Sequence, residues 1–156
     1  MLKKYVIVFL ISMVPIVELR GAIPIGVGAY TLPVLTTFII CIIGNMIPVP
    51  FIFLFARKVL EWGQDKPYIG PLFKWFIKKG HKGGQKLQSK AGRGLYYALF
   101  LFVGIPIPGT GAWTGTLAAS ILDLDFKKTV FSVLGGVLLA GIIMAVSSYG
   151  LFVIIF

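Results

Sequence analysis

Charged residues are scarce in this sequence of 156 residues, and acidic residues are the scarcest of them. Asp, Glu, Lys and Arg together make up 13% of the chain, and only five of these residues are acidic. An average soluble domain carries about 25% charged residues. Hydrophobic residues reach 58%, so the composition predicts an all-α integral membrane protein whose spans each need roughly 20 apolar residues.

Cysteine and histidine occur once each, as Cys41 and His81. A single cysteine excludes an internal disulfide. The sequence contains no cluster of His, Cys, Asp and Glu at metal-ligand spacing, no nucleophile motif and no nucleotide-binding loop. We therefore predict no enzyme, no metal and no cofactor. Without an ATP site, any transport would be driven by an ion gradient or would run downhill.

Positive charge is concentrated in one segment. Ten of the fifteen basic residues lie between Arg57 and Arg93. Because excess Lys and Arg mark cytoplasmic loops, we expect residues 57–93 on the cytoplasmic side of the cell (inner) membrane. Aromatic residues alternate with lysine in "PLFKWFIKKG", as in helices that lie among lipid headgroups. The residues assigned to the membrane surface are Arg57, Lys74, Lys78, Lys79 and Lys82.

This basic segment allows two interpretations. It either sets the topology and anchors the chain on anionic lipid headgroups, or it gathers an anionic substrate at the membrane surface. A nucleic acid partner is not expected, because a basic patch beside spanning segments already has the bilayer as its partner.

The rest of the chain divides into two halves with the same order of segments. Residues 4–32 form an apolar segment broken by proline and glycine, and an uninterrupted apolar run follows over residues 33–56. Residues 95–122 are broken in the same way, and residues 126–156 follow. Broken backbone survives in hydrocarbon only inside protein or beside a cavity. Such breaks in corresponding positions are typical of transporters with inverted repeats, so each half is predicted to be a re-entrant helical hairpin followed by a transmembrane helix.

We therefore predict one membrane domain with three parts: a first repeat (1–56), a basic amphipathic interfacial loop or helix (57–94) and a second repeat (95–156). Four ordinary crossings are the alternative. They would place Lys3 and Lys4 inside together with the basic segment, whereas the re-entrant arrangement places the N-terminus outside. One copy is small for enclosing a sealed pathway, which favours a homodimer.

A carboxylate and a guanidinium stand two residues apart in "PIVELRGAIP", residues 15–24. Neither is expected to face lipid, because a charge near the bilayer centre costs at least about 2.5 kcal/mol. Their spacing places Glu18 and Arg20 on the same side of an extended stretch. They either form an ion pair that pins the hairpin against Asn45 or the opposite loop, or they act on a substrate. In the second case Arg20 holds a phosphate and Glu18 exchanges a proton.

Asn45 is a polar residue within the apolar run 33–56. An amide at that depth is expected to bond to a neighbouring helix, or to a carbonyl freed by the prolines that follow. Contact with a substrate is the alternative.

The turn "PIPGTGAWTGT", residues 106–116, is the second candidate site. Its glycines would let backbone amides approach a ligand, and successive amides form an anion-binding concavity. Close packing of a hairpin is the competing interpretation, because small residues also let membrane helices approach. The candidate residues here are Gly109, Thr110, Gly111, Trp113 and Thr114.

Three motifs carry a resemblance to a known family: "ELRGAIP" (18–24), "GNMIPVPF" (44–51) and "PIPGTGAWTGTLAA" (106–119). In this order they resemble the small multidrug export proteins, which look like a compact relative of the DedA/VTT (SNARE-associated) superfamily. The resemblance implies two re-entrant hairpins packed face to face. Larger members of that superfamily are implicated in moving lipids such as polyprenyl phosphates. The turn 108–112 lacks the arginines of the DedA pattern.

Three functions remain open from the sequence. The first is a transporter or flippase for an anionic lipid, with the headgroup held by Arg20 and residues 109–116. The second is a small multidrug efflux protein that exchanges amphipathic cations for protons at Glu18. The third is a structural scaffold. Fixed positive charge at the cytoplasmic entrance favours an anionic substrate, so the sequence favours the first function.

Overall fold

The computed structural model describes the chain except residues 76, 79–84, 86–88, 90–91, 108 and 156, and it describes side chains as far as Leu151. The described part is helical and contains no strand, which confirms the all-α prediction. Two membrane-surface residues of the sequence prediction, Lys79 and Lys82, lie outside the described residues.

The first broken segment folds into two short helices with a reversal between them. Helix α1 (Leu2–Met13) ends just before Pro15, and α2 (Glu18–Pro24) runs into the π-helix η1 (Ile25–Ala29). Ile16 and Glu18 have positive φ angles of 76° and 50°, as a tight reversal requires. The reversal therefore occupies residues 14–17. The predicted extended stretch at Glu18 and Arg20 is wrong, because the helix resumes at Glu18 and continues to Pro24.

The first uninterrupted apolar run forms α3 (Val34–Met46) and α4 (Pro48–Gly63), separated by a bend at Ile47. Pro48 has no backbone N–H and crowds the preceding turn, which explains the bend. Together the two helices make a 30-residue apolar rod, Val34–Gly63, which is long enough to cross a bilayer. The predicted helix 33–56 thus continues seven residues beyond its expected end.

The second half begins with α6 (Gly94–Gly104) and α7 (Ala112–Ile121). The two helices are joined by residues 105–111, which we call the glycine–threonine turn. The last helix, α8, covers Phe126–Ile155. Its stretch Phe126–Leu151 is the second one that is long and apolar enough to span a membrane. This helix matches the apolar run predicted over residues 126–156.

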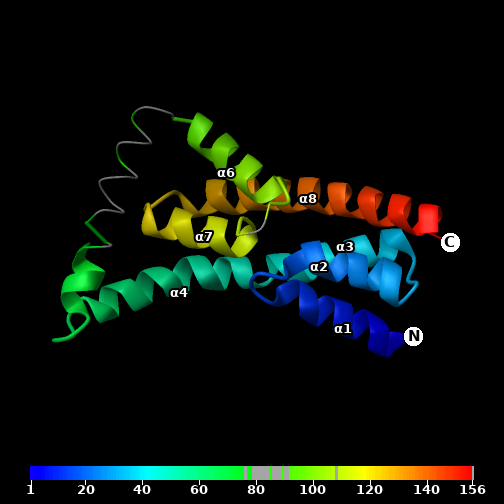
Figure 1. The fold of residues 1–156 in the computed structure, drawn as a ribbon. Coiled ribbons are helices and arrows are strands. Elements are labelled where there is room, and N and C mark those ends of the chain that lie inside the picture. The colour runs from blue at the N-terminus through cyan, green and yellow to red at the C-terminus, as the bar shows by residue number, and fades with distance from the viewer. Residues whose placement is uncertain (76, 79–84, 86–88, 90–91, 108, 156) are drawn as a thin grey trace.

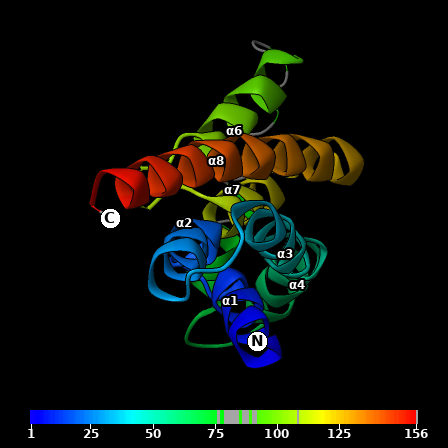
Figure 2. The same cartoon turned by 90° about the vertical axis from the view of Figure 1, so that its right-hand side faces the viewer.

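The helices are arranged so that two long rods carry two short hairpins (Figure 1, Figure 2). The α3–α4 rod and α8 extend along most of the molecule, while α1–α2 occupies one end and α6–α7 the other. Both chain termini lie at the α1–α2 end. The turns of the two hairpins meet near the middle of the molecule, where hydrogen bonds join them.

Small residues bring these helices close together. A Cβ atom placed on Gly136 of α8 would lie 2.7 Å from the carbonyl oxygen of Phe100 in α6. A Cβ atom on Gly44 of α3 would lie 2.8 Å from the carbonyl oxygen of Phe9 in α1. Such contacts allow the close backbone approach on which membrane helix packing relies.

The outer surface of the rods is apolar and exposed. Phe51 and Phe55 on α4 are 69% and 67% exposed, and Phe131 and Val146 on α8 are 73% and 68% exposed. Exposed apolar side chains along both long helices would be costly in water. They are suited to contact with lipid chains.

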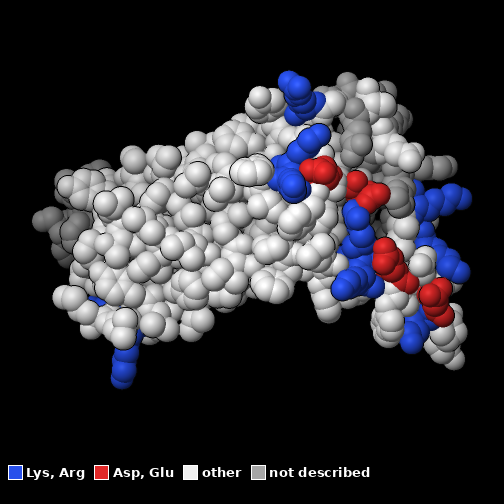
Figure 3. All heavy atoms as spheres, turned by 180° about the vertical axis from the view of Figure 1, so that it is seen from behind, with Lys and Arg blue, Asp and Glu red and all other residues white. Residues whose placement is uncertain are grey.

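Charged side chains gather at one end of the molecule, on the surface that faces the viewer in Figure 3. Lys, Arg, Asp and Glu cover the end formed by α4, the start of α6 and the turn between α7 and α8, and a broad uncharged belt follows. At this end Arg57 forms a salt bridge with Asp123, and the described lysines Lys74 and Lys78 are exposed. At the opposite end Lys4 Nζ donates to the carbonyl oxygen of Tyr30 at 3.2 Å.

Candidate functional site

The candidate site lies where the two hairpin turns meet, and Glu18 is its central acidic residue. Glu18 is the first residue of α2 and is only 3% exposed. Its Oε2 accepts a hydrogen bond from the N–H of Ala112 at 3.1 Å, and its Oε1 accepts one from the N–H of Trp113 at 2.9 Å. Both amides belong to the first turn of α7. The first hairpin thus supplies the N-terminal cap of a helix in the second hairpin.

This contact revises the interpretation of the glycine–threonine turn. The sequence predicted a concavity of backbone amides that would receive an anion. The amides are in place, but the anion that they bind is the carboxylate of Glu18. The positive end of the α7 dipole stabilises that charge as well. In the described part of the chain, Glu18 forms no salt bridge.

Arg20 makes the reciprocal contact with the other helix of the second hairpin. Its Nη1 donates to the carbonyl oxygens of Ile107 and Thr110, each at 2.6 Å. Its Nη2 donates to the carbonyl oxygens of Val103 and Ile105, at 3.0 and 3.2 Å. These carbonyls lie at the end of α6 and in the turn, where helical partners are missing. The guanidinium therefore satisfies backbone groups that hydrocarbon could not solvate.

Trp113 adds a third bond between the hairpins. Its indole Nε1 donates to the carbonyl oxygen of Met13, the last residue of α1, at 3.1 Å. Each hairpin therefore binds backbone groups at the end of a helix in the other one. We call these contacts of Glu18, Arg20 and Trp113 the cross-cap.

Gly111 is required by the cross-cap. Its φ angle is 143°, a region that residues with side chains rarely adopt. A Cβ atom at this position would also lie 2.8 Å from Cδ of Glu18. Glycine therefore lets the carboxylate reach the amides of α7.

A cavity of ≈ 490 Å³ opens beside the cross-cap. It is enclosed by the α1–α2 turn, by α4 and by the start of α7, and Glu18 is the acidic residue among its described lining. The sequence prediction contributed five of the lining residues, namely Glu18, Gly109, Thr110, Trp113 and Thr114. The structure brings these residues together, although the two groups are about ninety positions apart in the chain.

The remaining lining of this cavity is apolar and was not predicted from the sequence. It includes Ile52, Phe55 and Val59 of α4, together with Ile16 and Leu117. The three α4 residues follow the spacing of one helical stripe. In a helix this apolar, such a stripe cannot be distinguished from a surface that faces lipid, so no pattern in the sequence identifies it as a cavity wall.

Asn45 differs from its predicted role. The residue is 1% exposed, yet neither its Oδ1 nor its Nδ2 has a hydrogen-bond partner in the described structure. The expected bond to a neighbouring helix or to a freed carbonyl is therefore absent from the described residues. The buried hydroxyls of Thr116 and Thr129 also lack a hydrogen-bond partner among the described residues. Asn45 is not among the described residues that line the cavity.

The fold and the site define an α-helical membrane protein whose two long apolar helices support a pair of cross-capped hairpins. A comparison with known families identifies its family: the family described as "Putative small multi-drug export protein" matches residues 18–143 of the chain. The chain belongs to this family, and an export role in a membrane follows from the match. No curated protein and no solved structure matches the chain significantly.

Proposed function

We propose that this protein exports amphipathic cations across the cell membrane in exchange for protons, and that the two ligands compete for Glu18. The observation that carries this proposal is a buried carboxylate at the edge of an apolar cavity. None of the described residues that line the cavity is Lys or Arg. Its ≈ 490 Å³ lies within the range of cavities that hold small molecules. An apolar cation would gain both hydrophobic contact and a counter-charge there.

The bonding of Glu18 supports a coupling mechanism. Both carboxylate oxygens accept amide bonds from α7 while the group is ionised. A proton on one oxygen turns that oxygen into a donor and weakens its amide bond. Protonation would therefore loosen the contact between the hairpins and release the cation. Loss of the proton would restore the contact and the cation site. Exchange at one carboxylate thus links ligand binding to hairpin position.

The proposed topology follows the positive-inside rule and the hairpin arrangement. Residues 57–93 would face the cytoplasm, since the described basic residues gather at that end. The α1–α2 and α6–α7 hairpins would enter from opposite membrane faces as re-entrant segments of two inverted repeats, with the N-terminus outside. The domain parts 1–56, 57–94 and 95–156, a homodimer, and kinship with the DedA/VTT superfamily belong to this proposal as well.

Movement of an anionic lipid through the same site has less support. A phosphate at the hairpin turns needs a free cation, and the expected one was Arg20. The guanidinium of Arg20 instead donates to four carbonyl oxygens of the second hairpin. A phosphate would have to displace those bonds and leave the carbonyls of Val103 and Thr110 without a described partner, which is costly in the membrane interior.

A transport assay tests the proposed function. Proteoliposomes that contain the purified protein should accumulate tetraphenylphosphonium against its concentration gradient when a pH gradient is imposed. Glu18→Gln should abolish this accumulation. Thr114→Val is the matched control, because Thr114 lines the same cavity but carries no charge, and it should transport normally. Gradient-driven transport that persists in folded Glu18→Gln protein would refute proton exchange at this residue.

A further inference from the structure

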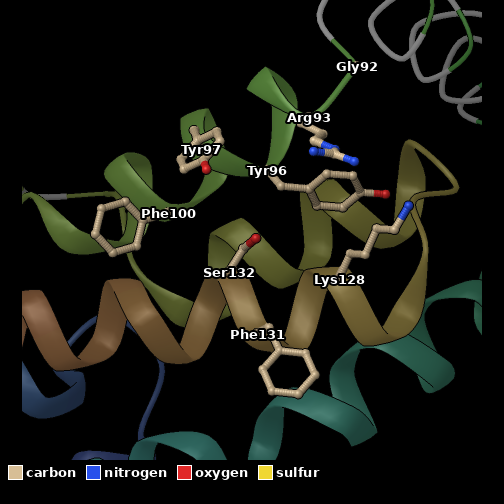
Figure 4. A pocket seen from close by; sticks show the side chains of 8 residues that line it. All are labelled: Gly92, Arg93, Tyr96, Tyr97, Phe100, Lys128, Phe131 and Ser132. Carbon is tan, nitrogen blue, oxygen red and sulfur yellow. The ribbon is translucent and has the colours of Figure 1, made fainter.

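A second hollow lies outside the cross-cap, at the charged end of the molecule (Figure 4). It is a groove of ≈ 790 Å³ between the start of α6 and the start of α8. We call it the α6–α8 groove. Its described lining consists of eight residues: Gly92, Arg93, Tyr96, Tyr97, Phe100, Lys128, Phe131 and Ser132.

Two cations stand at the mouth of the groove. Arg93 precedes the first residue of α6 and Lys128 is in the first turn of α8, and both are exposed. In Figure 4 their side chains approach the ring of Tyr96 from two helices. Lys128 Nζ lies 5.6 Å from the centroid of that ring, which is within the range of a cation–π contact. In the described part of the chain, neither side chain forms a salt bridge.

The nearby acidic group is already used by the backbone. Oδ1 of Asp125 accepts a hydrogen bond from the N–H of Lys128 at 2.9 Å, so this carboxylate caps α8. The N–H of Asp125 in turn donates to the hydroxyl oxygen of Tyr96 at 3.3 Å. These bonds fix Tyr96 between the two helices and leave the two cations able to bind an anion.

The polarity of the groove changes with depth. Phe100 lies seven residues after Arg93 on α6, or about 10 Å further along the helix axis. Ser132 lies one turn beyond Lys128 on α8. The groove thus runs from two cations, past the rings of Tyr96 and Tyr97, to an apolar floor at Phe100. A phospholipid has the same order: a phosphate at the interface, then the glycerol region, then acyl chains.

We infer that the α6–α8 groove binds one phospholipid with an anionic headgroup. This lipid would belong to the membrane leaflet at the charged end of the protein. Its phosphate lies between Arg93 and Lys128, and an acyl chain runs along Phe100. Charge complementarity selects this occupant, because each of the two exposed cations at the membrane surface attracts an anionic lipid headgroup. The site is separate from the cavity beside Glu18, so it does not depend on what that cavity exports.

Binding of phosphatidylglycerol to the lipid-free protein in detergent tests the inference, with native mass spectrometry as the readout. Wild-type protein should retain phosphatidylglycerol in preference to phosphatidylcholine. The double variant Arg93→Ala/Lys128→Ala should bind phosphatidylglycerol about 30-fold more weakly, since each basic residue near the surface contributes about 1 kcal/mol. Both residues are exposed, so the variant should melt like wild type.

The matched control is Lys58→Ala/Lys127→Ala, which removes the same charge from two exposed residues that do not line the groove. It should bind phosphatidylglycerol like wild type. An equal loss in the control would show attraction by surface charge alone and overturn the site. Equal binding of phosphatidylcholine would overturn the anionic headgroup. Displacement of phosphatidylglycerol by inorganic phosphate at similar concentration would show a phosphate site instead of a lipid site.

Discussion

Substitution of Arg20 by alanine should strongly destabilise the protein, because the guanidinium holds four backbone carbonyls of the other hairpin. The four bonds measure 2.6, 2.6, 3.0 and 3.2 Å. The Arg20 side chain is half-buried, and a hydrogen bond to a charged group contributes about 1.5–3 kcal/mol. Total stability is commonly about 5–15 kcal/mol, so this single change removes a large share of it.

The midpoint of thermal unfolding should therefore decrease by about 10 °C in Arg20→Ala. Arg20→Lys should recover part of this loss, because an ammonium has three donors but lacks the planar fork that reaches several carbonyls. Cys41 provides the assay. It is the single cysteine and is fully buried, so a thiol-reactive fluorophore reports unfolding in detergent.

The control is Arg93→Ala, measured without added lipid. Arg93 is exposed, and only its backbone carbonyl takes part in a described hydrogen bond, so loss of its side chain should change stability by less than about 0.5 kcal/mol. If Arg20→Ala melts as Arg93→Ala does, the carbonyl contacts carry no stability and the cross-cap is refuted. Arg20 would then be available for an anion.

Three further substitutions test the hairpin junction through the same melting assay. Gly111→Ala should cost at least about 2 kcal/mol, because its φ of 143° is strained with a side chain and the new Cβ meets Glu18; a normal melt would contradict this geometry. Trp113→Phe should cost about 1 kcal/mol through the lost bond to Met13, and equal melting would remove that bond from the account. Asn45→Val should not lower the midpoint, because the buried amide has no described partner; a clear loss would reveal one.

The sequence predicted much of the fold because its strongest signals are local. Long apolar runs predicted the two rods, and proline and glycine predicted breaks in the correct segments. The exact reversal was missed. Proline is tolerated in the first turn of a helix, and glycine is common in membrane helices. The positions of Gly21 and Pro24 therefore do not identify a single point at which the chain reverses.

The partners of Glu18 and Arg20 could not be predicted for a different physical reason. Side chains at these positions could pair with each other, with a ligand, or with the free ends of helices. The choice depends on which helix ends lie within reach, and that is set by tertiary packing. The amides of Ala112 and Trp113 are about ninety positions away in sequence, and no local pattern connects them to Glu18.

The most direct test of the account compares two hydrophobic ions of similar size and opposite charge. Calorimetry should show that wild-type protein binds tetraphenylphosphonium more tightly than tetraphenylborate, because Glu18 supplies a counter-charge in the cavity. Phe55→Ala should weaken both ions and keep that preference, since Phe55 contributes only apolar contact to the lining. Folded Glu18→Gln protein should lose the preference for the cation. An unchanged preference in Glu18→Gln, or tighter binding of tetraphenylborate by the wild type, would contradict the assignment of Glu18 as the cation site.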